Sequence, residues 1–282
     1  MLEWVLEPLT YEFMRNALAT GILVGVLCPV VGSYLIIQRM ALLGNSIAHA
    51  VLPGLAIANF LGINLLMGAF VFGLLSTFVI NWIRTQSRVK VDAAMALTLA
   101  SFFALGVVLL SVLDNRLDLE ELLFGDVLTV TTADVWRTSI IAAAILLLVK
   151  MLYKELLFYT FDPLGAEAVG LPVKAIDFGL TAAIALAIVA GIKTVGVILV
   201  ISLLVGPAIA AYLLVKELHC MMALGAVFGA LSSISGIYLS YYLDWPCGAA
   251  IALVVFSVFL VALFFSPSQG ILTRLNSNPY RG

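Results

Sequence analysis

Long apolar stretches separated by short polar connectors set the pattern of this chain. A helix that crosses a lipid bilayer needs roughly 20 predominantly apolar residues. By this length rule the sequence predicts an all-α polytopic membrane protein with eight or nine transmembrane helices, the sixth of them short and expected to be tilted or incomplete. The predicted spans cover about residues 17–37, 42–62, 65–83, 93–113, 135–157, 178–192, 195–215, 221–243 and 248–265.

The charges in the connectors predict which side of the membrane each faces. Arg84, Arg88 and Lys90 cluster after the third span, whereas the connector 114–134 is strongly acidic. Because short loops rich in Lys and Arg stay in the cytoplasm, the basic cluster is expected inside and the acidic loop outside. This places the N-terminus outside and the C-terminus inside. Four of the 14 basic residues then fall outside, namely Arg15, Arg116, Arg137 and Lys193.

The longest predicted cytoplasmic connector covers residues 159–177 and contains signals for a short helix of its own. Asp162 and Pro163 can begin a helix, Gly170 can end it, and Pro172 prevents its continuation. We expect this helix to lie outside the bilayer. It is either a plain connector or a contact for a soluble partner.

Composition agrees with a membrane protein and excludes a soluble domain. Hydrophobic residues make up 63% and charged residues 11% of the 282 residues, with a mean hydropathy of +1.18. Ordinary soluble domains have shares of about 45–50% and 25%. The acidic start lacks the basic region of a cleavable signal peptide, so the first span is expected to remain. The three cysteines are widely spaced and indicate neither disulfides nor structural zinc; they are Cys28, Cys220 and Cys247.

The most informative stretch is LLGNSIAHAVLPG in the second predicted span. Asn45 and His49 are four residues apart, so on a helix their side chains share one face. Pro53 lacks the N–H that would bond the carbonyl of residue 49. Polar groups in a membrane favour a functional site, here a station for a divalent cation. The alternative, about equally favoured by these residues alone, is a polar pair hydrogen-bonded to a neighbouring helix.

Other polar or helix-breaking residues carry weaker indications. Ser202, Gly206 and Pro207 could line a cavity where a kinked helix exposes backbone, although packing would explain them equally well. Asp92 is expected to cap the fourth span, with a gate or ion-exit role as the less favoured interpretation. His219 is expected to be an ordinary solvated residue at the cytoplasmic boundary.

Several classes of protein are excluded or disfavoured by what the sequence lacks. It contains no phosphate-binding GxxxxGK[ST] loop, no HExxH metalloprotease motif and no pair of intramembrane aspartates. Its predicted spans contain almost no carboxylate or lysine, which disfavours a proton-coupled carrier. The chain is therefore expected to be neither an ATPase nor another enzyme.

Five sequence blocks, in order, resemble the permease subunit of bacterial ABC importers for manganese, zinc or iron. They are LLGNSIAHAVLPG, SRVKVDAAMALTLASFFALGVVLLS, LLFGDVLTVT, KELLFYTFDPLGAEAVGLPV and GVILVISLLVGPAIAAYLL. The resemblance extends over nearly the whole chain. It implies a single permease domain over residues 1–282 in the bacterial cytoplasmic membrane.

The resemblance also implies partners and site residues. It implies a second copy of the chain, two cytoplasmic ATPase subunits that use ATP, an extracytoplasmic metal-binding protein and surrounding membrane lipid, with no nucleic acid and no permanently bound cofactor. The ATPase would contact the short helix through Asp162, Pro163, Ala166 and Gly170. The family pattern has an aspartate and a histidine as metal ligands one turn apart. The histidine corresponds to His49, whereas the aspartate is replaced by the neutral Asn45.

The sequence thus predicts the permease of an ATP-driven importer that moves manganese, or next zinc or iron, by alternating access. Two alternatives stay open at this point. One is a self-sufficient metal channel or secondary carrier, and the other is a membrane scaffold without a transport path.

Overall fold

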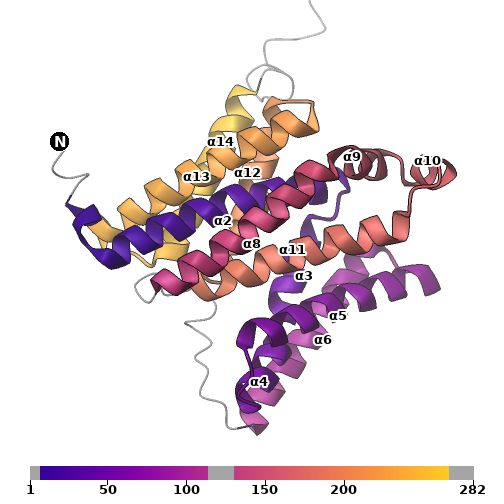
Figure 1. Ribbon diagram of the computed structural model, residues 1–282, viewed down its shortest axis with the longest axis horizontal. Coiled ribbons are helices and arrows are strands. Elements are labelled where there is room, and N and C mark those ends of the chain that lie inside the picture. Colours follow the sequence, from indigo (N-terminus) through magenta and orange to yellow (C-terminus); the bar gives the residue numbers. More distant parts are fainter. Residues whose placement is uncertain (1–6, 114–129, 267–282) are drawn as a thin grey trace, which may run out of the picture.

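The computed structural model describes residues 7–113 and 130–266, apart from the side chains of residues 193–195. This part of the chain is helical (Figure 1). The helices are η1 (Pro8–Thr10), α2 (Glu12–Ile37), α3 (Ala41–Ala50), α4 (Leu52–Phe60), α5 (Leu65–Gln86), α6 (Val91–Val112), α8 (Thr132–Met151), α9 (Tyr153–Phe161), α10 (Pro163–Ala168), α11 (Val173–Val195), α12 (Val197–Leu214), α13 (Leu218–Leu243) and α14 (Cys247–Phe265).

Nine segments of the described chain are long and apolar enough to cross a membrane, which confirms the predicted fold class. The second of them, Ala41–Phe60, is made of α3 and α4 together. The helix is interrupted at Val51, and α4 begins with Pro53 in its first turn. A proline is tolerated at a helix start, where its missing N–H has no intrahelical acceptor in any case.

The sixth span is complete rather than short. Helix α11 begins at Val173, directly after Pro172, and its span candidate extends to Ile192. The sequence-based boundary was placed after Lys174 and Asp177 because these charged residues resemble a connector. The hydroxyl of Tyr159 donates a hydrogen bond to Asp177, so the first turns of α11 carry a carboxylate with a partner from another helix.

The connector between the fifth and sixth spans covers residues 152–172, so both of its ends lie earlier in the chain than predicted. The fifth span ends at Met151, and α9 forms a separate helix up to Phe161. The predicted short helix is present as α10, where the Asp162 side chain accepts a hydrogen bond of 2.9 Å from the backbone N–H of Gly165. Gly170 follows the helix with φ +89°, a conformation that glycine adopts without strain. In Figure 1, α9 and α10 lie beside the ends of α8 and α11.

The spans are arranged as two groups joined by α3 and α11 (Figure 1). Helix α2 packs against α12 and α13, while α4 packs against α5 and α6. Glycines bring the backbones into contact within both groups, Gly25 with Gly229 across α2 and α13, and Gly54 with Gly68 across α4 and α5. Small residues provide such close contacts between membrane helices, where van der Waals packing replaces the hydrophobic effect.

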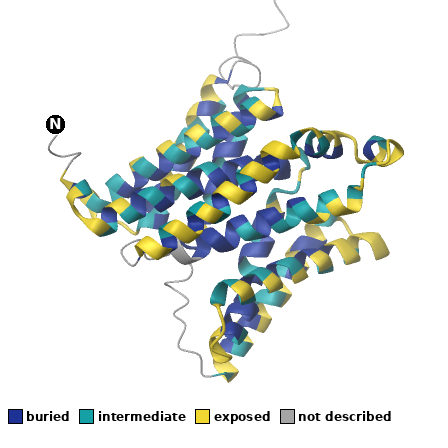
Figure 2. Ribbon diagram, in the orientation of Figure 1, coloured by how far each residue is buried: buried dark blue, intermediate teal, exposed yellow. Residues whose placement is uncertain are grey.

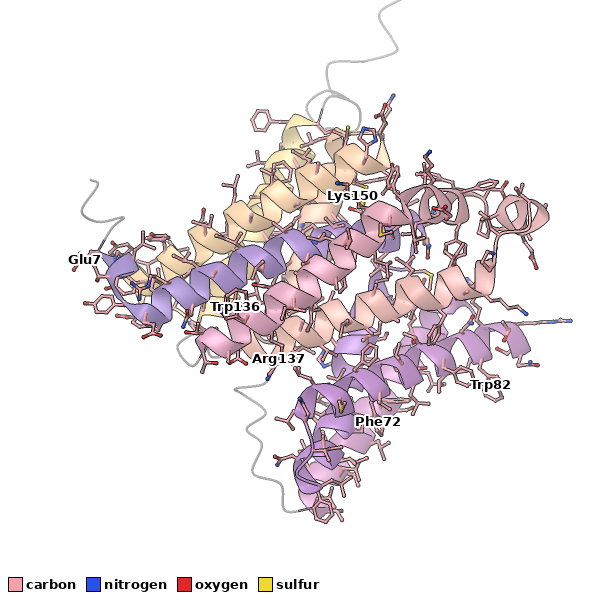
Figure 3. The ribbon with its side chains drawn as sticks, in the orientation of Figure 1. Glu7, Phe72, Trp82, Trp136, Arg137 and Lys150 are labelled. Carbon is pink, nitrogen blue, oxygen red and sulfur yellow. The ribbon has the colours of Figure 1, made fainter. Side chains whose placement is uncertain are left out.

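Burial is greatest in the centre of the bundle, and the outer faces remain apolar. Figure 2 shows dark blue, buried residues along the central helices and exposed residues along the periphery. Trp82 on α5 and Trp136 on α8 are exposed, and Figure 3 shows Trp82 projecting away from the neighbouring spans. Exposed apolar residues of this kind are expected where lipid surrounds a protein.

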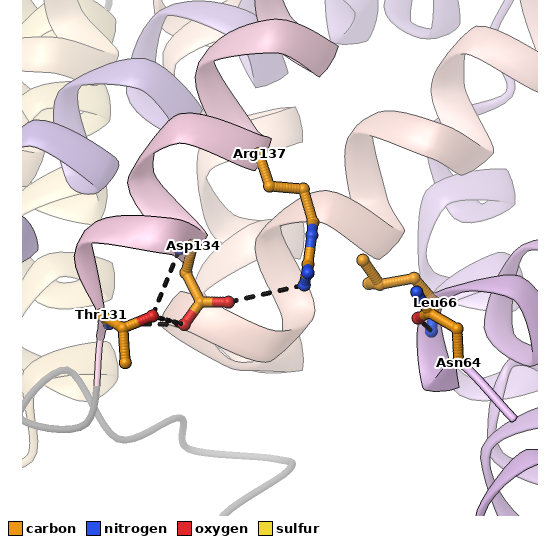
Figure 4. Close-up of polar contacts among 5 residues, drawn as sticks. All are labelled: Asn64, Leu66, Thr131, Asp134 and Arg137. Atoms are coloured by element: carbon orange, nitrogen blue, oxygen red, sulfur yellow. Dashed lines mark hydrogen bonds and ion pairs between the residues drawn. The ribbon is translucent and has the colours of Figure 1, made fainter. Parts of the chain in front are cut away.

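The acidic connector 114–134 lies largely outside the described residues, but its last member has a defined role. Asp134 is buried in the first turn of α8, where it and Thr131 form a capping box (Figure 4). The carboxylate also pairs with Arg137 at 3.6 Å. Asp134 is therefore a capping residue of α8 rather than a free acidic group of the connector.

Candidate metal site

Helix α3 carries both predicted donor residues and lies inside the bundle. Its N-terminal half approaches α12, where Gly44 lies against the side chain of Leu204. On the side of α6, the hydroxyl of Ser46 lies 3.3 Å from the carbonyl of Met95 and 3.0 Å from that of Leu42. Packing on one flank and a hydroxyl contact on the other thus fix the position of α3 between α12 and α6.

His49 lies in the last turn of α3 and is half-buried. The ring of Phe103 from α6 meets it edge-on, with 5.6 Å between the ring centroids. Within the described part of the chain, neither His49 nor Asn45 forms a hydrogen bond or an ion pair through its side chain. The alternative of a polar pair bonded to a neighbouring helix therefore receives no support, and both side chains are available to a ligand.

Asn45 borders a groove between α3, α12 and α14 with a volume of about 510 Å³. Ser202 and Gly206 of α12 line the same groove, so the structure brings together three of the residues singled out from the sequence. The Ser202 hydroxyl donates a 2.8 Å hydrogen bond to the carbonyl of Ile198. Its oxygen remains an acceptor toward the groove. The remaining lining is apolar: Ala41, Leu42, Ile201, Val205, Ile209, Ala252, Val255, Phe256 and Phe259.

Two other predicted residues lie elsewhere. Pro207 is buried inside α12, and the helix assignment continues through it from Val197 to Leu214. Asp92 is exposed in the first turn of α6, where Lys90 is the N-cap residue and no side chain caps the helix. The prediction that Asp92 caps the helix was wrong, because its side chain forms no cap hydrogen bond. Its carboxylate in the first turn still interacts favourably with the helix dipole.

The segment predicted to contact a partner also has an anchor that the sequence did not reveal. Tyr159 of α9 is bonded to Asp177 of α11 although the two residues are 18 positions apart. Burial and this hydrogen bond raise the pKa of Tyr159 above the ordinary value for tyrosine. The hydrogen bond between Tyr159 and Asp177 and the burial of Tyr159 hold α9, and α10 beyond it, against the start of α11.

A family model described as the ABC 3 transport family matches residues 10–266, nearly the whole chain. The chain belongs to this family. The match over residues 10–266, together with the nine candidate spans among the residues that the structure describes, confirms the predicted resemblance to ABC importer permeases. The match also confirms that the chain is a transport subunit rather than an enzyme, because the ATPase of this family is a separate subunit.

Named relatives and a solved structure cover almost all of this family member. The manganese transport system membrane protein MntC of Listeria monocytogenes is 43% identical over 93% of this chain and 94% of its own length. A probable iron transport system membrane protein of Haemophilus influenzae is 37% identical over 94% of this chain and 98% of its own. The structure of PsaBC from Streptococcus pneumoniae in complex with Fab aligns with a TM-score of 0.88 at 38% identity, covering 98% and 99% of the two chains.

Proposed function

We propose that this chain is the permease subunit of an ATP-driven importer for a divalent transition metal, manganese first and zinc or iron next. The observation that carries the proposal is the similarity, over more than nine-tenths of both chains, to a membrane protein named for manganese transport. The relative named for iron transport supports the wider class of substrate. Membership of an ABC transport family argues against a self-sufficient channel or secondary carrier.

In this proposal His49 and Asn45 hold the ion transiently inside the membrane. An imidazole nitrogen suits transition metals, and an amide oxygen suits the harder manganese ion. The two side chains lie one turn apart on α3 and form no hydrogen bond or ion pair with the described residues. Two ligands leave the coordination shell incomplete, so water or another helix supplies the rest. Weak ligation of this kind favours release of the ion on the other side.

The groove beside Asn45 is the proposed entry of the ion toward this pair. Ser202 and Gly206 line it on α12, and α3 and α14 form its other walls. Because the groove lies between three spans, a relative shift of these helices would open or close it. This is the kind of change that alternating access requires. Asp92 and Pro207 lie apart from the groove and have at most a secondary role in the path.

The proposed assembly contains a second copy of this chain, two ATPase subunits and an extracytoplasmic metal-binding protein in the bacterial cytoplasmic membrane. An ATPase contact through α10 is supported by two exposed apolar side chains, Leu164 within the helix (79% exposed) and Val169 at its C-terminal end (74% exposed). Ala166 is fully buried and holds the other side of the helix to the protein. Asp162 and Pro163 define its start, and Gly170 follows its end.

Reconstitution in liposomes tests this function. We expect manganese uptake when the permease is combined with its ATPase, its metal-binding protein and ATP. We expect none from the permease alone without ATP. Equal uptake by the permease alone would support the carrier alternative and overturn the proposal, as would a complete assembly that hydrolyses ATP but moves no divalent metal.

A further inference from the structure

A second group of metal-ligating side chains lies at the turn between α12 and α13, far from Asn45 in the sequence. Glu217, His219 and Cys220 each offer one ligand atom, and these atoms all lie within 4.8 Å of one another. From the sequence, His219 is expected to be solvated, and Cys220 is too far from the other cysteines to indicate a structural zinc site. In the structure, His219 and Cys220 converge on the same carboxylate.

Two of the three distances in this triad are close to those of a metal coordination shell. His219 Nε2 lies 3.2 Å from Glu217 Oε2, and Cys220 Sγ lies 3.9 Å from the same oxygen. Zinc bonds of about 2.0–2.3 Å arranged as a tetrahedron separate neighbouring ligand atoms by about 3.3–3.8 Å. The three side chains would therefore need only small adjustments to hold one ion.

The orientation of Glu217 strengthens this interpretation. Glu217 is the N-cap residue of α13, and an acidic side chain there commonly accepts a bond from the first backbone N–H groups. Its side chain makes no such cap bond and is turned toward His219 and Cys220 instead. The side chains of Glu217 and His219 are 69% and 62% exposed, so an ion can reach them from water.

We propose that Glu217, His219 and Cys220 form a binding site for a borderline-soft divalent cation, with Zn²⁺ as the best match. A thiolate and an imidazole favour zinc over manganese, whereas a carboxylate accepts either ion. Three protein ligands leave a fourth tetrahedral position for water. The triad therefore differs in preference from Asn45 and His49, which lack a thiolate.

The triad lies on the side of the spans that carries α9 and α10. His219 lines a pocket of about 360 Å³ together with Lys150 at the end of α8 and Tyr153 at the start of α9. The basic connectors predict that this side is cytoplasmic. A bound ion would tie down the turn that joins α12, which borders the Asn45 groove, to α13.

Cobalt binding to the purified full-length permease tests the site directly. Co²⁺ replaces Zn²⁺ in such sites and gives a thiolate-to-metal charge-transfer band in the near ultraviolet. We expect this band in the wild type and its displacement by Zn²⁺. We expect its loss in Cys220→Ser, and at least tenfold weaker binding in His219→Asn and Glu217→Gln.

Cys247→Ser is the matched control, because Cys247 is a free, half-buried cysteine at the start of α14. It should keep the band, and its elution profile should match those of the triad variants if all of them fold. The absence of a thiolate band in the wild type, or its survival in Cys220→Ser, would overturn the proposal.

A regulatory consequence follows that rests on the proposed function. If the occupied triad restrains α12, Zn²⁺ on the ATPase side should slow ATP-driven manganese uptake in the wild type more than in Cys220→Ser. Equal slowing of both would overturn this regulatory role while the cobalt band still decides the site. The absence of uptake without Zn²⁺ would count against the transport function instead.

Discussion

The protein has two histidines, His49 and His219, and they lie in opposite surroundings. His49 is half-buried between spans, with Asn45 one turn away and the edge of Phe103 beside its ring. His219 is exposed at a helix start, with a carboxylate and a thiol close to it. The first site offers two neutral donors and the second offers three donors, two of which are anionic when deprotonated.

The two sites therefore suit two different tasks, the passage of an ion through the membrane and the stable binding of an ion. An ion that must leave on the far side needs a site with few and weak ligands, as at Asn45 and His49. A site that holds an ion benefits from a nearly complete shell, as at the turn before α13. The two sites also differ in what builds them. The triad lies within four consecutive residues, whereas α3 depends on packing against α6 and α12.

The largest expected effect comes from Gly32→Ala on α2, which breaks the packing of α2 against α12, the helix that also supports α3. An added methyl group would meet the backbone carbonyl of Leu204 on α12, which cannot yield as a side chain can. We expect a loss of about 1–3 kcal/mol in stability, as for other overpacked positions. Thermal unfolding in detergent measures it, and uptake should fall with it.

Gly179→Ala is the control for this substitution, since no heavy atom lies within 4 Å of its added methyl group. It should unfold at or above the wild-type temperature. Folded Gly32→Ala protein should still give the cobalt band of the triad, because that site is local. An unchanged unfolding temperature in Gly32→Ala would contradict the packing account.

The next largest effect is expected for His49→Ala. Removal of the imidazole should lower ATP-driven manganese uptake at least tenfold, equivalent to about 1.4 kcal/mol. Phe103→Leu serves as a comparison, because it removes the ring beside His49 and keeps the imidazole. Wild-type uptake by His49→Ala would remove this residue from the path.

Asn45→Asp is expected to change manganese uptake less than His49→Ala does, because it raises the affinity for manganese while it slows turnover. A carboxylate binds manganese more strongly than an amide does, so the KM for manganese should fall several-fold while turnover slows. Asn45→Ala should raise the KM, since it removes the oxygen. Initial uptake rates over a range of manganese concentrations give both constants, and identical KM values in all three proteins would exclude ligation by residue 45.

The smallest effect is expected at the anchor of α9. Tyr159→Phe removes the hydrogen bond to Asp177 and should cost about 0.5–1.5 kcal/mol below pH 10. Because the folded state raises the pKa of Tyr159, its stabilisation is present below the ordinary tyrosine pKa of about 10 and is lost as the pH rises beyond it. The difference between wild type and variant should therefore shrink above pH 10. A constant difference across that range would contradict this role.

Hydropathy was sufficient to predict the spans, because a membrane requires long apolar helices whose backbone groups bond internally. Hydropathy alone did not locate the interruption at Val51, for which Pro53 is the local signal, or the separate helix α9. It also misplaced the start of α11, where Tyr159 satisfies Asp177 from a distant helix. The i, i+4 spacing identified Asn45 and His49 as one face of a helix.

The sequence could not identify the residues that surround Asn45 and His49. Ser202 was a candidate for a cavity, but only the fold shows that it shares a groove with Asn45. Nothing in the sequence marked Phe103 as the neighbour of His49. For the triad the sequence does contain a local signal, because Glu217, His219 and Cys220 lie within four residues. This spacing indicates a metal site only together with the structure, in which the three side chains converge.

Pulsed electron paramagnetic resonance of bound Mn²⁺ tests the central claim most directly, because it detects an imidazole nitrogen in contact with the ion. His219→Ala leaves His49 as the protein's one histidine. We predict a nitrogen hyperfine coupling in that variant and its loss when His49→Gln is added. The absence of coupling in His219→Ala under conditions where manganese is bound, or its persistence after His49→Gln, would contradict the account.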